Sequence, residues 1–152
     1  MKMADPKLEM RNSKIGLSVA HGDARIRDFT DLAVWKLTRE LRKNICSLTR
    51  KFPSDEKYSL ASQVRRAAIS ITANIAEGFG RYSYQENIQF CRQARGSAFE
   101  VRDHLVTAQD EGYLTAVEHR LMDDLAQRVI QTLNGYIRST QARQSAKAQA
   151  KS

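Results

Sequence analysis

The chain has 152 residues and a formal net charge of +8, and 41% of its residues are hydrophobic but only 7% are aromatic. This length fits one domain, whose core must be largely aliphatic. The low counts of glycine (7) and proline (2) argue against an all-β protein with many turns. No stretch approaches the roughly 18 apolar residues of a membrane span, and none has the apolar core of a signal peptide. The sequence therefore predicts a cytoplasmic protein.

Most of the basic excess lies at the two ends of the chain. Residues 1–27 carry a net charge of +3, residues 138–152 carry +4, and the segment 28–137 carries only +1. The first 27 residues show no sustained apolar period, so we expect a disordered basic arm there. Residues 139–152 are low in complexity and lack large apolar side chains, so we expect a fraying basic tail. The folded domain is expected over 28–138.

The first two predicted helices are separated by a proline. Over about 29–50, leucine and isoleucine recur at spacings of three and four, which is typical of one helix face. Pro53 ends this pattern, because the residue before a proline avoids helical dihedrals. The second helix is predicted over about 55–78, with Ser54 as its cap and acidic residues in its first turn.

Two further helices are predicted, over about 84–109 and about 116–138. Each begins with a capping box, formed by Ser83 with Glu86 and by Thr115 with Glu118. The connections between the four helices are short, which forces neighbouring helices to run antiparallel. The sequence therefore predicts an all-α fold, an antiparallel up-down-up-down four-helix bundle with flexible N- and C-terminal tails.

Residues that carry enzyme chemistry are sparse and scattered. The histidines, cysteines and acids show no metal-ligand spacing, and buried structural thiols are the better explanation of Cys46 and Cys91. The sequence has neither a phosphate-binding glycine loop after a strand nor a nucleophile elbow. We therefore predict a protein that is not an enzyme and that has no metal or cofactor.

A polar line runs beside the apolar stripe of the second helix, at spacings of three and four. It consists of Gln63, Arg66, Ser70, Asn74 and Glu77. Serine and asparagine are mediocre helix formers, so contact with another helix or subunit would explain them, and a solvated face is the alternative. The third helix offers a counterpart in Gly96, Ser97 and Glu100. A mid-helix glycine costs about 1 kcal/mol against alanine, which is reasonable if another backbone lies against it.

Basic residues gather between the end of the first helix and the middle of the third, with tyrosines among them. Such a surface can contact phosphates and stack bases, although an ordinary solvated surface has a similar composition. The candidate nucleic-acid-binding residues are Arg50, Lys51, Lys57, Arg65, Arg66, Arg81, Arg92 and Arg95, with Arg138, Arg143 and Lys147 at the C-terminal end.

Several motifs resemble a family of bacterial four-helix-bundle proteins encoded in intervening sequences of ribosomal RNA genes. The most specific one is the run Asn74-Ile-Ala-Glu-Gly78, within a longer pattern over 63–81. The other matching motifs are Leu32-Ala-Val-Trp35, Phe52-Pro53-x-x-Glu56-x-Tyr58-x-Leu60, Phe90-x-x-x-Ala94-x-Gly96-Ser97-x-x-Glu100 and Gly112-Tyr113-Leu114. The resemblance covers residues 28–137.

This resemblance implies an up-down bundle that assembles into a ring-like homopentamer. A related branch, the accessory variability determinant of diversity-generating retroelements, resembles this family in fold, binds nucleic acid and associates with a reverse transcriptase. The resemblance therefore implies nucleic-acid binding and makes a reverse transcriptase a candidate partner. The markedly basic body of that branch is not reproduced here, since 28–137 carries only +1, which shifts the expected contacts toward the tails.

Two functional hypotheses follow. The first is a non-enzymatic homo-oligomer, in the form of a pentamer, that binds RNA or DNA through its basic residues. The second is a protein-interaction scaffold, or an accessory subunit for a partner such as a reverse transcriptase, without direct contact to nucleic acid.

Overall fold

Four long helices account for most of residues 25–151, which are the residues that the computed structural model describes. They are α1 (Ala33–Leu48), α2 (Leu60–Gly80), α3 (Tyr84–Asp110) and α4 (Ala116–Gln149), and the short 3₁₀ turns are η1 (Phe29–Asp31), η2 (Thr49–Lys51) and η3 (Ser54–Tyr58). The described residues contain no strand. The predicted N-terminal arm at 1–27 lies outside the described residues, apart from 25–27.

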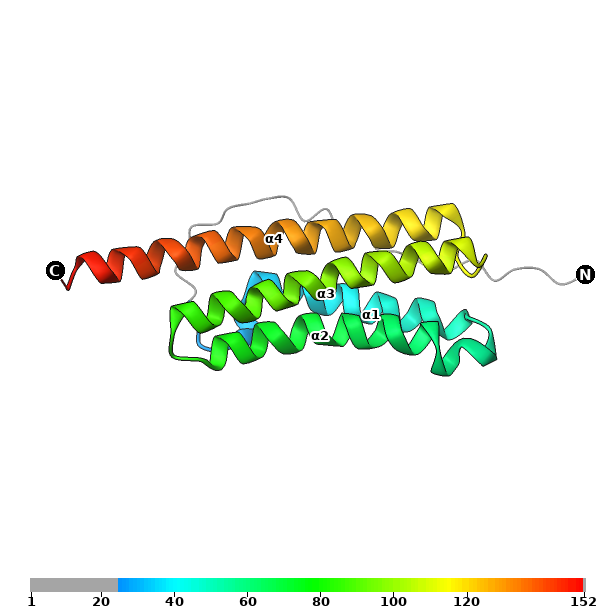
Figure 1. Cartoon of the computed structure of the whole chain (residues 1–152), viewed down its shortest axis with the longest axis horizontal. Coiled ribbons are helices and arrows are strands. Elements are labelled where there is room, and N and C mark those ends of the chain that lie inside the picture. The colour runs from blue at the N-terminus through cyan, green and yellow to red at the C-terminus, as the bar shows by residue number, and fades with distance from the viewer. Residues whose placement is uncertain (1–24, 152) are drawn as a thin grey trace, which may run out of the picture.

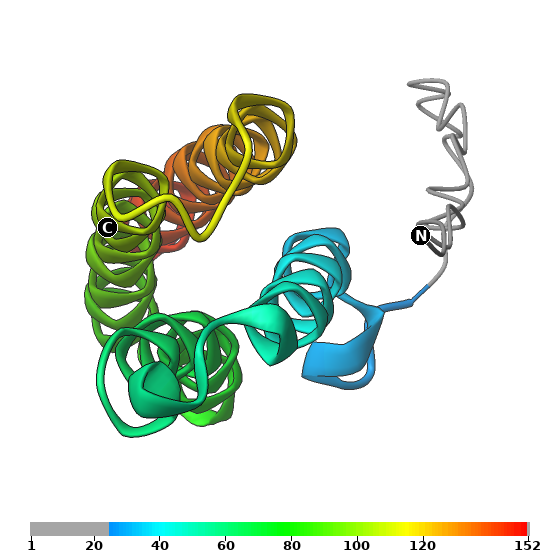
Figure 2. The same ribbon diagram turned by 90° about the vertical axis from the view of Figure 1, so that its right-hand side faces the viewer.

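Consecutive helices run antiparallel and pack side by side (Figures 1 and 2). The most extensive contact is between α2 and α3, followed by that between α3 and α4, while α1 packs against both α2 and α4. The predicted all-α fold, an antiparallel bundle of four helices, is confirmed. No helix among residues 25–151 is both long enough and apolar enough to cross a membrane.

The core is aliphatic, as the low aromatic content requires. Its largest fully buried side chains include Leu41, Ile45, Ile71, Leu105 and Leu133, so every helix contributes to it. Removing this apolar surface from water is the main force that holds the helices together.

Small residues let α2 and α3 approach closely. Gly78 is buried, and a Cβ atom added there would lie 2.9 Å from Cβ of Phe90 and 3.2 Å from the backbone oxygen of Asn87. Farther along the same contact, the hydroxyls of Ser70 and Ser97 are hydrogen-bonded at 2.9 Å. Gly78 is therefore required at a helix contact and does not merely mark the end of α2.

The start of α2 differs from the prediction. Residues 54–58 form η3, and the backbone of Ser59 then leaves helical geometry, so α2 begins at Leu60 instead of near Asp55. Neither Ser54 nor Ser59 supplies the predicted side-chain cap. The carboxylate of Glu56 accepts a hydrogen bond from the backbone N–H of Leu60 instead, at 3.1 Å.

Helix α4 is longer than predicted, because it continues past Arg138 to Gln149. Its last buried side chains are Ile137 and Thr140, and all side chains from 141 to 151 are exposed. Alanine, glutamine, lysine and arginine are good helix formers. Their abundance explains why residues 141–149 stay helical although none of their side chains is buried. The C-terminal basic residues are therefore carried on a helix beyond the packed bundle (Figure 1).

We predict that Gly78→Ala destabilises the fold by about 1 to 3 kcal/mol, because the added methyl group forces α2 and α3 apart. Gly80→Ala is the matched control in the same helix, since its Cβ would meet nothing within 4 Å. Urea unfolding followed by circular dichroism measures both variants. Equal stability of the two variants would contradict the close-packing role of Gly78.

Candidate nucleic-acid interface

The predicted basic residues are divided between the two ends of the bundle. We call the end where α1 joins α2 and α3 joins α4 the loop end, and the end where α2 joins α3 and α4 extends outward the tail end (Figure 1). Arg50, Lys51, Lys57 and Arg65 lie at the loop end, on or beside η2, η3 and the first turns of α2. Arg81, Arg143 and Lys147 lie at the tail end. The single cluster expected from the sequence is thus separated by the length of α2, roughly 30 Å for 21 residues.

Arg81 is tied down at the start of the α2–α3 connection. Its guanidinium donates to the carboxylate of Glu77 at 2.8 Å and lies 3.8 Å from that of Glu86. It also lies 5.2 Å from the ring centroid of Phe90, a cation–π distance. Arg81 is therefore largely neutralised by its neighbours, and its main effect is to order this connection.

Two tyrosines follow Arg81, and α4 brings cations to them. The side chain of Tyr82 is fully exposed, and Nζ of Lys147 lies 5.6 Å from the ring centroid of Tyr84. Arg143 donates to Oγ of Ser139 at 3.1 Å. Together with Tyr82 and Tyr84, it lines a hollow with a volume of about 180 Å³. This contact depends on the extension of α4, because a helix ending at residue 138 would not carry either cation.

We define the tail-end cluster as Arg81, Tyr82, Tyr84, Arg143 and Lys147. Arg81, Tyr82, Tyr84 and Arg143 line one hollow between the α2–α3 connection and α4. Lys147 does not line this hollow but lies over the ring of Tyr84. The floor includes Tyr136, whose hydroxyl accepts a hydrogen bond of 3.4 Å from the side-chain amide of Asn87. Burial raises the pKa of Tyr136 above its ordinary value.

The loop end holds a second basic hollow of about 290 Å³, to which Arg50, Lys57 and Arg65 contribute. Nε of Arg65 donates to the buried hydroxyl of Thr49 at 2.6 Å. Lys51, the neighbouring candidate, is instead ion-paired with Glu118 at the start of α4. This pair helps to lower the pKa of Glu118 against the opposing effect of its partial burial.

Tyr113 and Glu56 join the two connections at the loop end. Gly112, with φ +74, ends α3 in a Schellman-type turn, in which the N–H of Tyr113 reaches the carbonyl of Ala108 at 2.9 Å. The Tyr113 hydroxyl donates to Glu56 at 2.9 Å, and its ring packs on Phe52 with centroids 5.5 Å apart. Hydrogen bonds from the Leu60 N–H and the Tyr113 hydroxyl lower the pKa of Glu56, and the bond to Glu56 raises the pKa of Tyr113.

The remaining basic candidates lie on the outer faces of the helices. Arg66, Arg92 and Arg138 are exposed. Arg95 instead donates to the side-chain oxygen of Asn134 at 2.8 Å and so links α3 to α4. Arg95 therefore has a structural bond within the chain.

The predicted polar contact residues behave in different ways. Ser70 and Ser97 meet between α2 and α3, and the amide of Asn74 donates to the backbone oxygen of Ser70 at 2.9 Å and to its hydroxyl at 3.1 Å. Glu77 is engaged with Arg81. Gln63, Gly96 and Glu100 are exposed. A Cβ atom at Gly96 would meet nothing within 4 Å, so no backbone of this chain lies against it.

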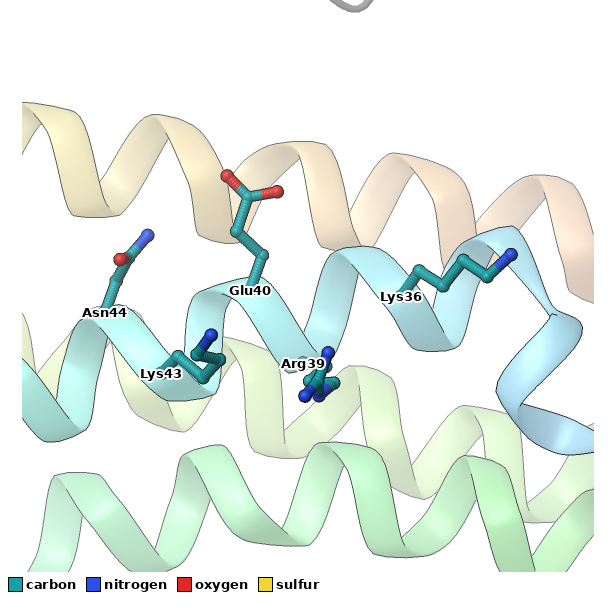
Figure 3. Close-up of a pocket in the computed structure, with 5 residues that line it drawn as sticks. All are labelled: Lys36, Arg39, Glu40, Lys43 and Asn44. Atoms are coloured by element: carbon teal, nitrogen blue, oxygen red, sulfur yellow. The ribbon is translucent and has the colours of Figure 1, made fainter. Parts of the chain in front are cut away.

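A basic stripe on α1 escaped the sequence-based prediction. Lys36, Arg39 and Lys43 border a shallow hollow of about 170 Å³ together with Glu40 and Asn44, and all five side chains belong to α1 (Figure 3). The spacing of three and four between the cations was available as a signal. The three cations lie on the polar face of α1, whereas this helix was predicted from its apolar face alone.

The salt bridge of Arg102 with Asp123 was also missed, because its partners come from different helices. Nε of Arg102 donates to Asp123 at 2.6 Å and one terminal nitrogen does so at 3.3 Å. The side-chain amide of Gln127 donates to the same carboxylate at 2.6 Å. Among residues 25–151, no group of three or more histidine, cysteine or acidic side chains is arranged to hold a metal ion.

Comparisons with known proteins match the folded part of the chain. The model of the family described as 23S rRNA-intervening sequence protein matches residues 30–135. A solved protein of unknown function from the S23 ribosomal protein family of Bacteroides thetaiotaomicron superposes with a TM-score of 0.64 at 22% identity, over 68% of this chain and 97% of that one. At this identity, the structural likeness concerns the fold alone. No curated protein sequence matches the chain.

We predict that Tyr113→Phe lowers the melting temperature at neutral pH, because Glu56 loses one of the hydrogen bonds that stabilise its ionised form. The pKa of Glu56 is lowered in the folded state, so this contribution is present above the unfolded-state pKa and disappears as the pH falls through the folded-state pKa. The difference from the unaltered chain should therefore shrink in acid.

Thermal unfolding at several pH values measures this effect. Tyr82→Phe is the matched control, because it removes a hydroxyl from a fully exposed ring. A deficit of Tyr113→Phe that does not change with pH would show that the loop-end contact does not act through the Glu56 carboxylate.

Proposed function

We propose that this chain, which belongs to the 23S rRNA-intervening sequence protein family, is a non-enzymatic protein that binds RNA or DNA through its basic residues, chiefly the tail-end cluster. The observation that carries the proposal is the meeting of two tyrosines with cations of α4. The exposed Tyr82 and the half-buried Tyr84 line one hollow with Arg143, and Lys147 lies over the Tyr84 ring. Aromatic faces stack bases and nearby cations contact phosphates, which is the usual chemistry of single-strand binding.

The geometry of the tail-end cluster supports stacking. Tyr82 is fully exposed and both faces of its ring can accept a base, while Tyr84 already carries Lys147 over its ring. Stacking of one base on an aromatic side chain contributes about 1 to 3 kcal/mol whatever the base. A contact of this kind binds single strands with little sequence preference.

The charge of the α4 extension supports phosphate contacts. Residues 138–151 include four basic residues and no acidic one, namely Arg138, Arg143, Lys147 and Lys151. By contrast, Arg81 is balanced by Glu77 and Glu86. The free positive potential at the tail end therefore comes mainly from α4.

A competing function is contact with a protein partner, such as a reverse transcriptase, without direct binding of nucleic acid. It is favoured by half-exposed apolar side chains on the outer surface. Ile69 of α2 is 50% exposed, and Phe99 and Val106 of α3 are 51% and 47% exposed. If the unaltered chain binds no nucleic acid in the assays below, this alternative is favoured.

We also propose that the chain assembles into a homopentamer. The same apolar side chains support association between copies, because exposed apolar patches mark protein contacts. Gly96 also supports assembly. A Cβ atom at this mid-helix position would meet nothing within 4 Å, and the use of glycine there is explained if the backbone of another copy packs against it.

Replacing two cations of α4 tests the nucleic-acid proposal. We expect Arg143→Gln/Lys147→Gln to weaken binding of a single-stranded RNA. The slope of log affinity against log salt should flatten by about 1.4, since each phosphate contact to a single strand contributes about 0.7. Fluorescence anisotropy over a series of salt concentrations gives the slope. Both side chains are exposed, so the fold is retained.

Arg120→Gln/Arg128→Gln is the matched control, because it removes the same charge from exposed positions of the same helix. This control should keep the slope of the unaltered chain. Equal slopes in the two double variants would show that net charge, and not the tail-end cluster, drives binding.

The assembly proposal is tested by the mass of the full chain in light scattering. We expect a mass near five chains, and we expect Gly96→Leu to lower it because a large side chain would hold the copies apart. Ala142→Leu, at an exposed position of α4 beyond the packed bundle, is the control. A single-chain mass for the unaltered protein, or an unchanged mass for Gly96→Leu, would contradict this account of Gly96.

A further inference from the structure

The loop-end hollow has features that the function proposed above does not use. It lies where η2, η3 and the first turns of α2 meet, so three elements each contribute one cation: Arg50, Lys57 and Arg65. Phe52 and Pro53 form an apolar part of the wall. Its volume of about 290 Å³ is near the lower limit for small-molecule sites.

The hollow is partly preorganised. Nε of Arg65 is held by the Thr49 hydroxyl at 2.6 Å, and Thr49 is itself buried and bonded to the backbone oxygen of Ile45 at 2.9 Å. This chain of bonds fixes the orientation of the Arg65 guanidinium and occupies its Nε, leaving the terminal nitrogens for another acceptor. A guanidinium with a fixed plane is well suited to the two-oxygen contact that arginine makes with phosphate.

None of the described residues that form the wall of the hollow carries an acidic side chain. The nearest acids in the sequence are engaged elsewhere or excluded from the lining: Glu56 accepts from Leu60 and Tyr113, and Asp55 does not line the hollow. Lys51 and Glu118 neutralise each other outside it.

We infer that the loop-end hollow binds a phosphate monoester. Three cations from three elements, with no acid in the wall, match a group that carries about −1.5 to −2 charges at neutral pH. The same group is found on a small phosphate ester and at the 5′ end of a nucleic acid. The inference stands independently of the tail-end cluster, which lies at the opposite end of the bundle (Figure 1).

The first experiment uses inorganic phosphate and the full chain. We expect phosphate to raise the melting temperature above its value in sodium chloride of equal ionic strength, because a ligand that binds only the folded state stabilises it. The increment should be lost in Arg50→Gln/Lys57→Gln, which spares the Arg65–Thr49 bond, and kept in the matched control Arg120→Gln/Arg128→Gln, which removes two charges from exposed positions of α4. No increment in the unaltered chain, or an equal increment in both variants, would overturn the inference.

The second experiment compares one RNA oligonucleotide with a 5′-phosphate and with a 5′-hydroxyl. Where the natural source is an RNA end, the phosphorylated form binds on the order of tenfold more tightly, and Arg50→Gln/Lys57→Gln removes the preference. Where the source is a small ester, the cation-dependent response to inorganic phosphate persists and the two RNAs bind equally. The loss of 5′-hydroxyl RNA binding in Arg143→Gln/Lys147→Gln reports on the tail-end cluster, and the 5′-phosphate preference reports on the loop-end hollow, so failure of one proposal is distinguishable from failure of the other.

Discussion

The close approach of α2 and α3 is the constraint on which the rest of the structure depends. It requires a residue without a side chain at Gly78, where even one methyl group would lie 2.9 Å from Phe90. The Ser70–Ser97 hydrogen bond continues the same contact toward the loop end. With this pair in place, α1 is bonded to α2 through Arg42 and Thr72 at 2.9 Å, and α4 is bonded to α3 through Arg95 and Arg102. The bundle is thus built on the α2–α3 pair, with α1 packed on α2, α4 packed on α3, and α1 and α4 in contact with each other.

This arrangement determines where the charged residues can act. Because the helices are long and antiparallel, residues close in sequence near a connection share one end, and residues one helix apart lie at opposite ends. The basic residues therefore make two separate surfaces. At the tail end, tyrosines meet the cations of α4; at the loop end, three cations surround a hollow with an apolar wall. The tail end therefore favours a single-stranded nucleic acid whose bases stack on the tyrosines, and the loop end favours a phosphate group.

Hydropathy was sufficient to predict the four helices and their antiparallel order, because each helix carries an apolar stripe and the connections are short. It was not sufficient for features that depend on contacts distant in sequence. The start of α2 was placed too early because Glu56, and not a serine, satisfies its first N–H. The Glu56–Tyr113 and Arg102–Asp123 bonds join residues of different elements, and no local pattern reports them. Helix α4 was ended too early because its last turns bury nothing, although their composition favours a helix.

The most direct test of the account is to locate RNA on the chain by photocrosslinking with a 4-thiouridine-labelled oligonucleotide, followed by mass spectrometry. The account predicts crosslinks at Tyr82 and Tyr84 and in the peptides of the α4 extension, because these are the aromatic and basic groups of the tail-end cluster. Crosslinks confined to exposed rings elsewhere, such as Tyr58 at the loop end, or the absence of crosslinks, would contradict it.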